Sequence, residues 1–194
     1  MINQSFPDVD GWKDDRSLWN AFQKGNRLAF EQIYRTHIQH LIRYGYKVTH
    51  DKPVIQDCIQ DLFMELWDSR ENLSEVLSIK HYLLKSLRYK IVRSISRHPT
   101  EALETAELET DEDHFEMQLM REEIGIQQNR KLHAALSRLP KRQKEAIFLR
   151  YFEELSNEEV ADLMGVNYQS ACKFIYSGLK NLREVMLALF LFFF

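Results

Sequence analysis

Glycine and proline are scarce in this chain, which has 6 glycines and 4 prolines among 194 residues. Strand-rich folds need many tight turns, and these two residue types make most of them. The shortage therefore favours an all-α fold. Cysteine is scarcer still, and Cys58 and Cys172 match neither a metal-binding nor a redox spacing. We expect them to act as small apolar residues in a reducing compartment.

Long apolar runs are also missing. About 20 consecutive apolar residues are needed to span a bilayer, and the apolar tract at 187–194 has eight. The first 15 residues carry four aspartates instead of the basic and then apolar order of a signal peptide. We therefore expect a cytoplasmic location. The apolar tract is either a final helical turn that packs on its own domain, or a latch for a partner or a degradation signal.

Charge is distributed unevenly along the chain, although the net charge is only −3. Residues 1–98 carry 15 Lys and Arg against 12 Asp and Glu, which gives +3. Residues 99–127 carry 1 against 10, which gives −9, and residues 128–194 carry 10 against 7, which gives +3. This pattern suggests two modules that bind a polyanion, joined by an extended acidic linker.

Three apolar stripes with spacings of three and four predict three helices in the first block. The stripes run through 30–44, 55–67 and 79–95, with a break at Asp51-Lys52-Pro53 and an end at Pro99. Each helix is too amphipathic to stand alone, so we expect a bundle.

The last block is punctuated like a helix-turn-helix. Ser156 and Glu159 have the spacing of a capping box, Gly165 permits a left-handed turn, and Asn167 can cap the following helix. The predicted helices are 129–136, 141–152, 157–164 and 168–187.

The final helix is predicted to have two unlike sides. The side expected to dock on the domain carries Ala171, Ile175, Leu179, Leu182 and Met186. The opposite side carries Gln169, Ser170, Lys173, Ser177 and Lys180, which suit base edges and phosphates in a major groove. A plain helical hairpin with a polar, solvated face is the alternative.

Two further surfaces are suggested by residue type. Lys85, Arg88, Tyr89 and Arg93 lie away from the apolar stripe of their helix and suit single-stranded DNA, with Tyr89 stacking on an unpaired base. The polar segment 68–78 before them could form a pocket for an extruded base. A solvated helix face explains the basic residues equally well.

The acidic residues Asp57 and Asp61 stand one turn apart beside Gln60, above an apolar stripe that ends in Trp67. They suit a basic partner helix, or are ordinary surface acids. His37 and His40 share a helical face without a third ligand at a suitable spacing, so we expect no metal site and no cofactor. No constellation for nucleophilic catalysis or phosphate binding is apparent, and we predict no enzyme.

Together these segments resemble the extracytoplasmic-function (ECF) sigma factors of bacterial RNA polymerase. The resemblance is carried in region two by Gly25-Asn26, Ala29-Phe30, Tyr34, 57–63, Leu66-Trp67, Tyr82-Leu83 and Ile91. In region four it is carried by Leu139-Pro140, Gln143, Phe148, Arg150-Tyr151, 159–161 and Gly165-Val166. The Tyr168-Gln169-Ser170 opening of the last helix resembles the Bacteroidetes branch of this family.

The resemblance implies a division into an N-terminal tail (1–17), a region 2 bundle (18–98), an acidic linker (99–127), a region 4 helix-turn-helix domain (128–187) and an apolar tail (188–194). It also implies roles for individual residues. Core polymerase would be gripped by Asp57, Gln60, Asp61, Phe63 and Trp67. The downstream promoter element would be opened by Lys85, Arg88, Tyr89 and Arg93. The upstream element would be read by Arg150, Tyr168, Gln169, Ser170, Lys173, Tyr176 and Lys180.

The implied partners are core RNA polymerase, promoter DNA and a membrane-bound anti-sigma factor. Cys172 and Ser177 depart from the family pattern, because basic residues are usual at those positions. Two other functions stay open at this point: a helix-turn-helix regulator that acts without polymerase, and a helical adaptor that binds no DNA.

Overall fold

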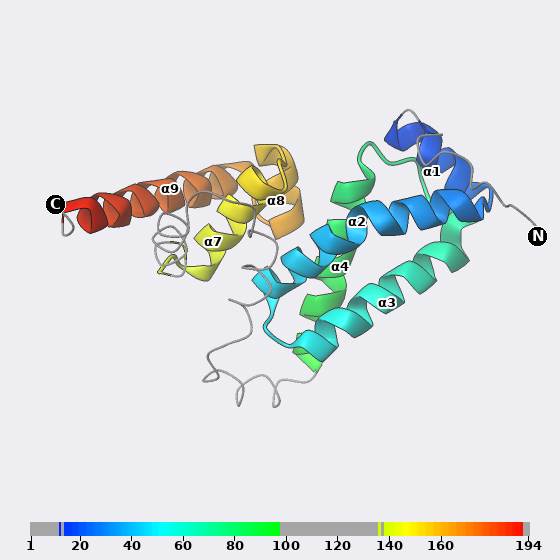
Figure 1. Cartoon of the computed structure of the whole chain (residues 1–194), viewed down its shortest axis with the longest axis horizontal. Coiled ribbons are helices and arrows are strands. Elements are labelled where there is room, and N and C mark those ends of the chain that lie inside the picture. The colour runs from blue at the N-terminus through cyan, green and yellow to red at the C-terminus, as the bar shows by residue number, and fades with distance from the viewer. Residues whose placement is uncertain (1–11, 13, 98–135, 137, 192–194) are drawn as a thin grey trace, which may run out of the picture. The chain divides into compact units, whose positions relative to one another are not determined.

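A computed structural model describes residue 12 and residues 14–97, 136 and 138–191 of the chain (Figure 1). The acidic linker, all but one residue of the helix predicted at 129–136, and the last three residues of the tail lie outside this range. The described residues contain helices and no strand, which confirms the all-α fold. They fall into two compact units, an N-terminal and a C-terminal domain.

The N-terminal domain consists of α1 (Asp15–Gln23), α2 (Arg27–Val48), α3 (Lys52–Ser69), a 3₁₀ turn η1 (Arg70–Asn72) and α4 (Ile79–Arg97). Helices α2, α3 and α4 confirm the three helices predicted from the apolar stripes. Asn26 caps α2 by accepting from the N–H groups of its first turn, and Asp51 caps α3 in the same way. These caps satisfy donors that a helix cannot pair internally.

The apolar stripes of these helices meet in one core. The α4 stripe is fully buried at Ile79, Leu83, Leu87 and Ile91. Helix α1 was not expected from apolar spacing, since nine residues hold little periodicity, yet its Trp19 and Phe22 are fully buried in the same core. The helix is held at its start by a capping box between Asp14 and Ser17, and so crosses the expected tail boundary at residue 18.

The C-terminal domain consists of α7 (Lys141–Ile147), a π-helical turn η2 (Phe148–Phe152), α8 (Asn157–Met164) and α9 (Tyr168–Leu191). The predicted capping box is confirmed: Ser156 Oγ accepts from the Glu159 N–H at 3.1 Å, and Glu159 accepts from the Ser156 N–H at 2.8 Å. Gly165 ends α8 with a φ of +64°. Asn167 then accepts from the Ser170 N–H at 2.7 Å and starts α9.

The buried side of α9 differs from the prediction at one position. Ala171 and Ile175 are buried as expected, but Leu179 is 37% exposed. Gly178 is buried instead. Here α9 lies so close to α7 that a Cβ at this position would be 2.6 Å from Cδ1 of Ile147. The close approach of the two helices at Gly178 turns Leu179 toward solvent. Within the described part of the chain, no helix is long and apolar enough to cross a membrane.

Candidate nucleic-acid and protein interfaces

Helix α4 presents the predicted single-strand-binding residues on its outer side. Lys85, Tyr89 and Arg93 are exposed, and Arg88 is half-buried. The Tyr89 side chain is 65% exposed although tyrosine has a large apolar ring. Lys85, Tyr89 and Arg93 are four residues apart, and Arg88 is three residues from Lys85, so all four lie on the side of α4 opposite the buried stripe. An exposed ring among cations is suited to stacking on a base while the charges hold the backbone.

Helix α9 presents a second polar face. Gln169, Lys173, Tyr176 and Lys180 are exposed at spacings of four, three and four residues, and Ser170 is half-buried. Tyr176 is 71% exposed. Because α8 and Gly165 fix the start of α9, this face has the arrangement of a recognition helix whose N-terminal residues contact base edges.

Side-chain hydrogen bonds stabilise the helix-turn-helix, both in the turn before α8 and between α8 and α9. Arg150, predicted to contact DNA, donates from its guanidinium to the Leu155 carbonyl at 3.0 Å. Asn157 on α8 donates to Cys172 Sγ on α9 at 3.6 Å. A hydrogen bond between Tyr168 and Cys172 raises the pKa of Tyr168. Cys172, which departs from the family pattern, therefore joins the two helices of the motif.

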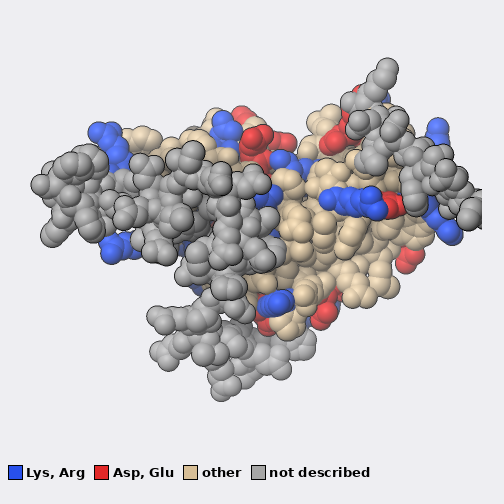
Figure 2. Space-filling view, viewed as in Figure 1, with Lys and Arg blue, Asp and Glu red and all other residues tan. Residues whose placement is uncertain are grey.

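A third surface is a groove of about 670 Å³ between α2 and α3. These helices lie side by side (Figure 1), and the surface over them carries few charges (Figure 2). The groove is lined from α2 by Phe30, Tyr34, Ile38 and Ile42, and from α3 by Gln56, Ile59, Gln60, Phe63, Met64, Trp67 and Asp68.

The rings along this groove pack on one another. Phe63 lies 4.8 Å from Tyr34 and 6.0 Å from Phe30, and Phe30 lies 5.1 Å from Trp67, measured between ring centroids. Arg70 stacks over the Trp67 ring at 4.7 Å. Contacts of this kind order an aromatic surface before any partner arrives.

The predicted docking residues divide between the groove and its edge. The groove is lined by Gln60, Phe63 and Trp67. The exposed residues Asp57 and Asp61 each directly follow a groove-lining glutamine on α3, and so lie at the edge of the groove. The α2 side of the groove was missed in the sequence. Its signal was a second stripe, Phe30, Tyr34, Ile38 and Ile42, which repeats every four residues beside the core stripe.

The sequence matches two parts of one protein family, in the same order as the two domains. Residues 33–99 match Sigma-70 region 2, and residues 129–182 match Sigma-70, region 4. The RNA polymerase sigma factor SigZ of Bacillus subtilis is 24% identical over 157 residues, which cover 81% of this chain and 82% of SigZ. The ECF RNA polymerase sigma factor SigX of the same species is 25% identical over 163 residues, with coverage of 81% and 84%.

Two solved structures have a similar fold. One is CnrH in complex with the cytosolic domain of CnrY, with a TM-score of 0.60 and 18% identity, covering 93% of this chain and 99% of that one. The other is the sigma factor RpoE in complex with the anti-sigma factor NepR from Bartonella quintana, with a TM-score of 0.58 and 17% identity, covering 81% and 96%. With regions 2 and 4 matched in order, the chain belongs to the ECF-type sigma-70 family of transcription initiation factors.

Proposed function

We propose that this sigma factor binds core RNA polymerase through the α2–α3 groove and reads promoter DNA with the outer faces of α4 and α9. The observation that carries the proposal is the presence of two polar, aromatic helix faces, one in each domain. Recognition of two promoter elements requires two such faces. A regulator that acted without polymerase would need only the helix-turn-helix, and a helical adaptor would need neither.

On α4, Lys85, Arg88 and Arg93 hold the backbone of the downstream element, and Tyr89 stacks on an unpaired base. On α9, Gln169 and Ser170 address base edges of the upstream element, while Lys173 and Lys180 contact phosphates or guanine. Tyr168, Tyr176 and Arg150 complete this interface. Phosphate contacts supply affinity, and base contacts supply the sequence preference.

The groove suits a basic partner helix. Its floor is aromatic and its α3 edge carries Asp57 and Asp61, so an arriving helix would bury apolar side chains and pair its cations at the edge. We assign this surface to the core polymerase.

An anti-sigma factor is a further proposed partner. The two neighbours with a similar fold were solved with CnrY and with the anti-sigma factor NepR. A partner that covers the groove would keep this chain from polymerase, and we infer that it is membrane-bound while the sigma factor acts in the cytoplasm. Membership of the Bacteroidetes branch stays a prediction based on Tyr168-Gln169-Ser170.

The test is transcription of fragmented genomic DNA by purified core polymerase with and without this protein. We expect discrete start sites that core polymerase alone does not produce. Absence of both core binding and new start sites would remove the proposal. Start sites that depend on α9 but not on the groove would favour a regulator that acts without it.

Asp61→Lys tests the groove assignment directly. We expect core affinity to fall, because a cation then faces a basic partner. Gln39→Lys is the control, since Gln39 is exposed on α2 and is not among the residues that line the groove. Equal core affinity for the two variants would contradict the assignment.

A further inference from the structure

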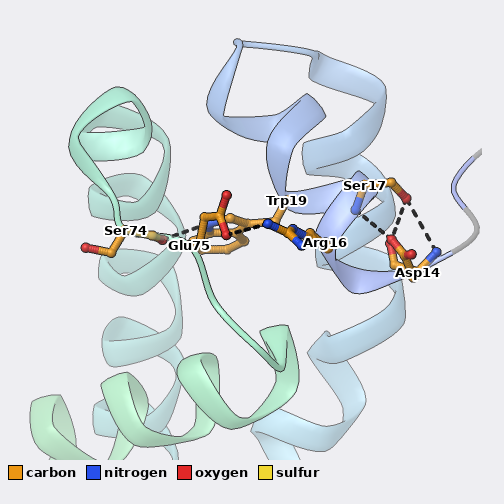
Figure 3. Close-up of polar contacts among 6 residues, drawn as sticks. All are labelled: Asp14, Arg16, Ser17, Trp19, Ser74 and Glu75. Carbon is orange, nitrogen blue, oxygen red and sulfur yellow. Dashed lines mark hydrogen bonds and ion pairs between the residues drawn. The ribbon is translucent and has the colours of Figure 1, made fainter.

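Helix α1 is attached to the loop between η1 and α4 by side chains from one of its faces. Trp19 Nε1 donates to the Ser74 carbonyl at 3.0 Å, as Figure 3 shows, and Gln23 Nε2 donates to the Leu73 carbonyl. Asp15 accepts from the Ile79 N–H at 2.8 Å. Because these three α1 residues are four apart, they follow one side of the helix.

The attachment is part of the core and not a surface contact. Trp19 is 1% exposed, and its ring lies 5.2 Å from Phe22 and 5.3 Å from Tyr82. The indole N–H therefore cannot turn away without disturbing the packing of α1 on α4. The position of the Ser74 carbonyl is thus set by the core of the domain.

The second end of the loop is fixed by a carboxylate from outside α4. Ile79 is the first residue of α4, so its N–H has no partner within the helix. Asp15 supplies that partner, and its negative charge suits the N-terminal end of the helix dipole. Ser78 Oγ accepts from the His81 N–H at 3.2 Å and adds a cap from within the loop.

Between these anchors the loop presents a leucine to solvent. The Leu77 side chain is fully exposed, although the residues on either side of the loop are tied down. Leu77 is therefore exposed in a loop whose backbone is held by hydrogen bonds on both sides of it. Leu77 precedes the first residue of α4 by two positions. Lys85, on the proposed DNA-binding face, lies six residues after that first residue, which is about 9 Å along the helix axis at 1.5 Å per residue.

An exposed ion pair also joins α1 to this loop. Arg16 pairs with Glu75 (Figure 3) at a distance of 3.1 Å, and both side chains are mostly solvent-exposed. Exposed pairs contribute little to stability. Arg16 therefore touches the same loop as Trp19 and Gln23 but should not fix its backbone, and this makes it a matched control.

We propose that α1 is a positioning element for promoter recognition: Asp15, Trp19 and Gln23 hold the loop so that Leu77 contacts an unpaired base of the downstream element. The proposal rests on the function proposed above for the α4 face. The family match starts at residue 33, so α1 lies outside it. The three side chains act through their hydrogen bonds to the loop and are therefore positioning residues, whereas Leu77 is the contact residue.

The test uses holoenzyme assembled from core polymerase and the full chain, on a pool of promoters with a randomised downstream element. Templates recovered in open complexes are sequenced, and the ratio of the preferred to the disfavoured base is obtained at each position. This ratio does not depend on how much protein is folded, so a merely destabilised variant leaves it unchanged.

Trp19→Phe combined with Gln23→Met removes two donors and keeps both side chains apolar enough for their buried surroundings, although Phe lacks one ring of the indole. Losing a hydrogen bond that orders the loop should reduce the base ratio at one position by roughly five- to tenfold. Leu77→Ala, which cannot disturb the core, should reduce the ratio at the same position. Arg16→Gln should leave the ratio as it is.

Three results would overturn the positioning role. They are an unchanged ratio in the double variant, a change at different positions for the double variant and Leu77→Ala, and an equal change in Arg16→Gln. If wild-type holoenzyme itself selects no base in the downstream element, the proposed function fails, which is a separate result.

Discussion

Gly178 and Gly165 lie in the same domain, and each is glycine for a different physical reason. A Cβ on Gly178 would meet Ile147 at 2.6 Å, and such overpacking costs about 1–3 kcal/mol. The higher helix propensity of alanine offsets about 1 kcal/mol of that. Gly165 has open space around it but a φ of +64°, so alanine there costs about 1 kcal/mol through its backbone alone.

We therefore expect Gly178→Ala and Gly165→Ala both to destabilise the C-terminal domain. The three tryptophans, Trp12, Trp19 and Trp67, all precede the linker. Tryptophan fluorescence consequently reports unfolding of the N-terminal domain, whereas far-UV circular dichroism reports both domains. Urea unfolding should shift in the dichroism signal and stay unchanged in fluorescence. A matching shift in fluorescence would show that the two domains unfold together.

His37 makes the N-terminal domain sensitive to pH. The pKa of His37 is lowered to about 4, mainly by burial. Attraction to Asp15 raises this pKa, and repulsion from His40 and Lys80 lowers it further. In the unfolded chain the pKa returns to about 6.5. Between these values the unfolded state binds the proton, so stability is full above pH 6.5 and is lost as the pH falls toward 4.

The expected loss is on the order of 3 kcal/mol at most, at 1.36 kcal/mol per pKa unit. His37→Leu should flatten the decline in unfolding free energy between pH 6.5 and 4, measured by tryptophan fluorescence in urea. His50→Gln is the control, because His50 is exposed at the end of α2. An equally steep decline in His37→Leu would assign the effect to the carboxylates.

At the scale of elements, hydrophobic spacing predicted the long helices well and the short one not at all. Helices α2, α3 and α4 each show a stripe over several turns, whereas α1 has nine residues and owes its place to contacts with a loop more than 50 residues away. Spacing also could not separate a core stripe from a groove stripe on α2. Spacing also placed Leu179 on the buried side of α9, because it gives no weight to a glycine that lets two helices approach each other closely.

The outer face of α9 gives an element-scale prediction. Lys173 and Lys180 are exposed on it, and each neutralised phosphate adds about 0.9 to the slope of log affinity against log salt. Lys173→Gln should lower this slope by about 1 for holoenzyme on upstream-element DNA. Gln169→Ala should instead relax the preference at one base and leave the slope unaltered. If Lys173→Gln instead changed the base preference and Gln169→Ala changed the salt slope, Lys173 would be the base-reading residue and Gln169 the phosphate contact.

At the scale of the whole molecule, the two domains should contribute independently to promoter binding. Tyr89 on α4 and Lys173 on α9 belong to separate compact units. Substitutions at distant, independent sites add within about 0.5 kcal/mol. Tyr89→Ala combined with Lys173→Gln should therefore weaken open-complex formation by the sum of the single effects, measured as equilibrium binding on one promoter.

Tyr89→Phe separates stacking from other roles of the same residue. A phenyl ring stacks on a base as well as a phenol does, so this variant should keep most of the affinity that Tyr89→Ala loses. A large departure from additivity in the double variant would mean that the domains communicate through polymerase or DNA.

The close contact between Gly178 and α7 also sets the tilt of α9, because the helix would rotate about this point if the contact were widened. Gln169 stands nine residues before Gly178, or about 14 Å along the helix axis. A methyl group that tilted α9 by about 10° about that point would therefore swing Gln169 through about 2 Å, enough to break a hydrogen bond to a base. Selection for accurate DNA reading would then act on a glycine that never touches DNA.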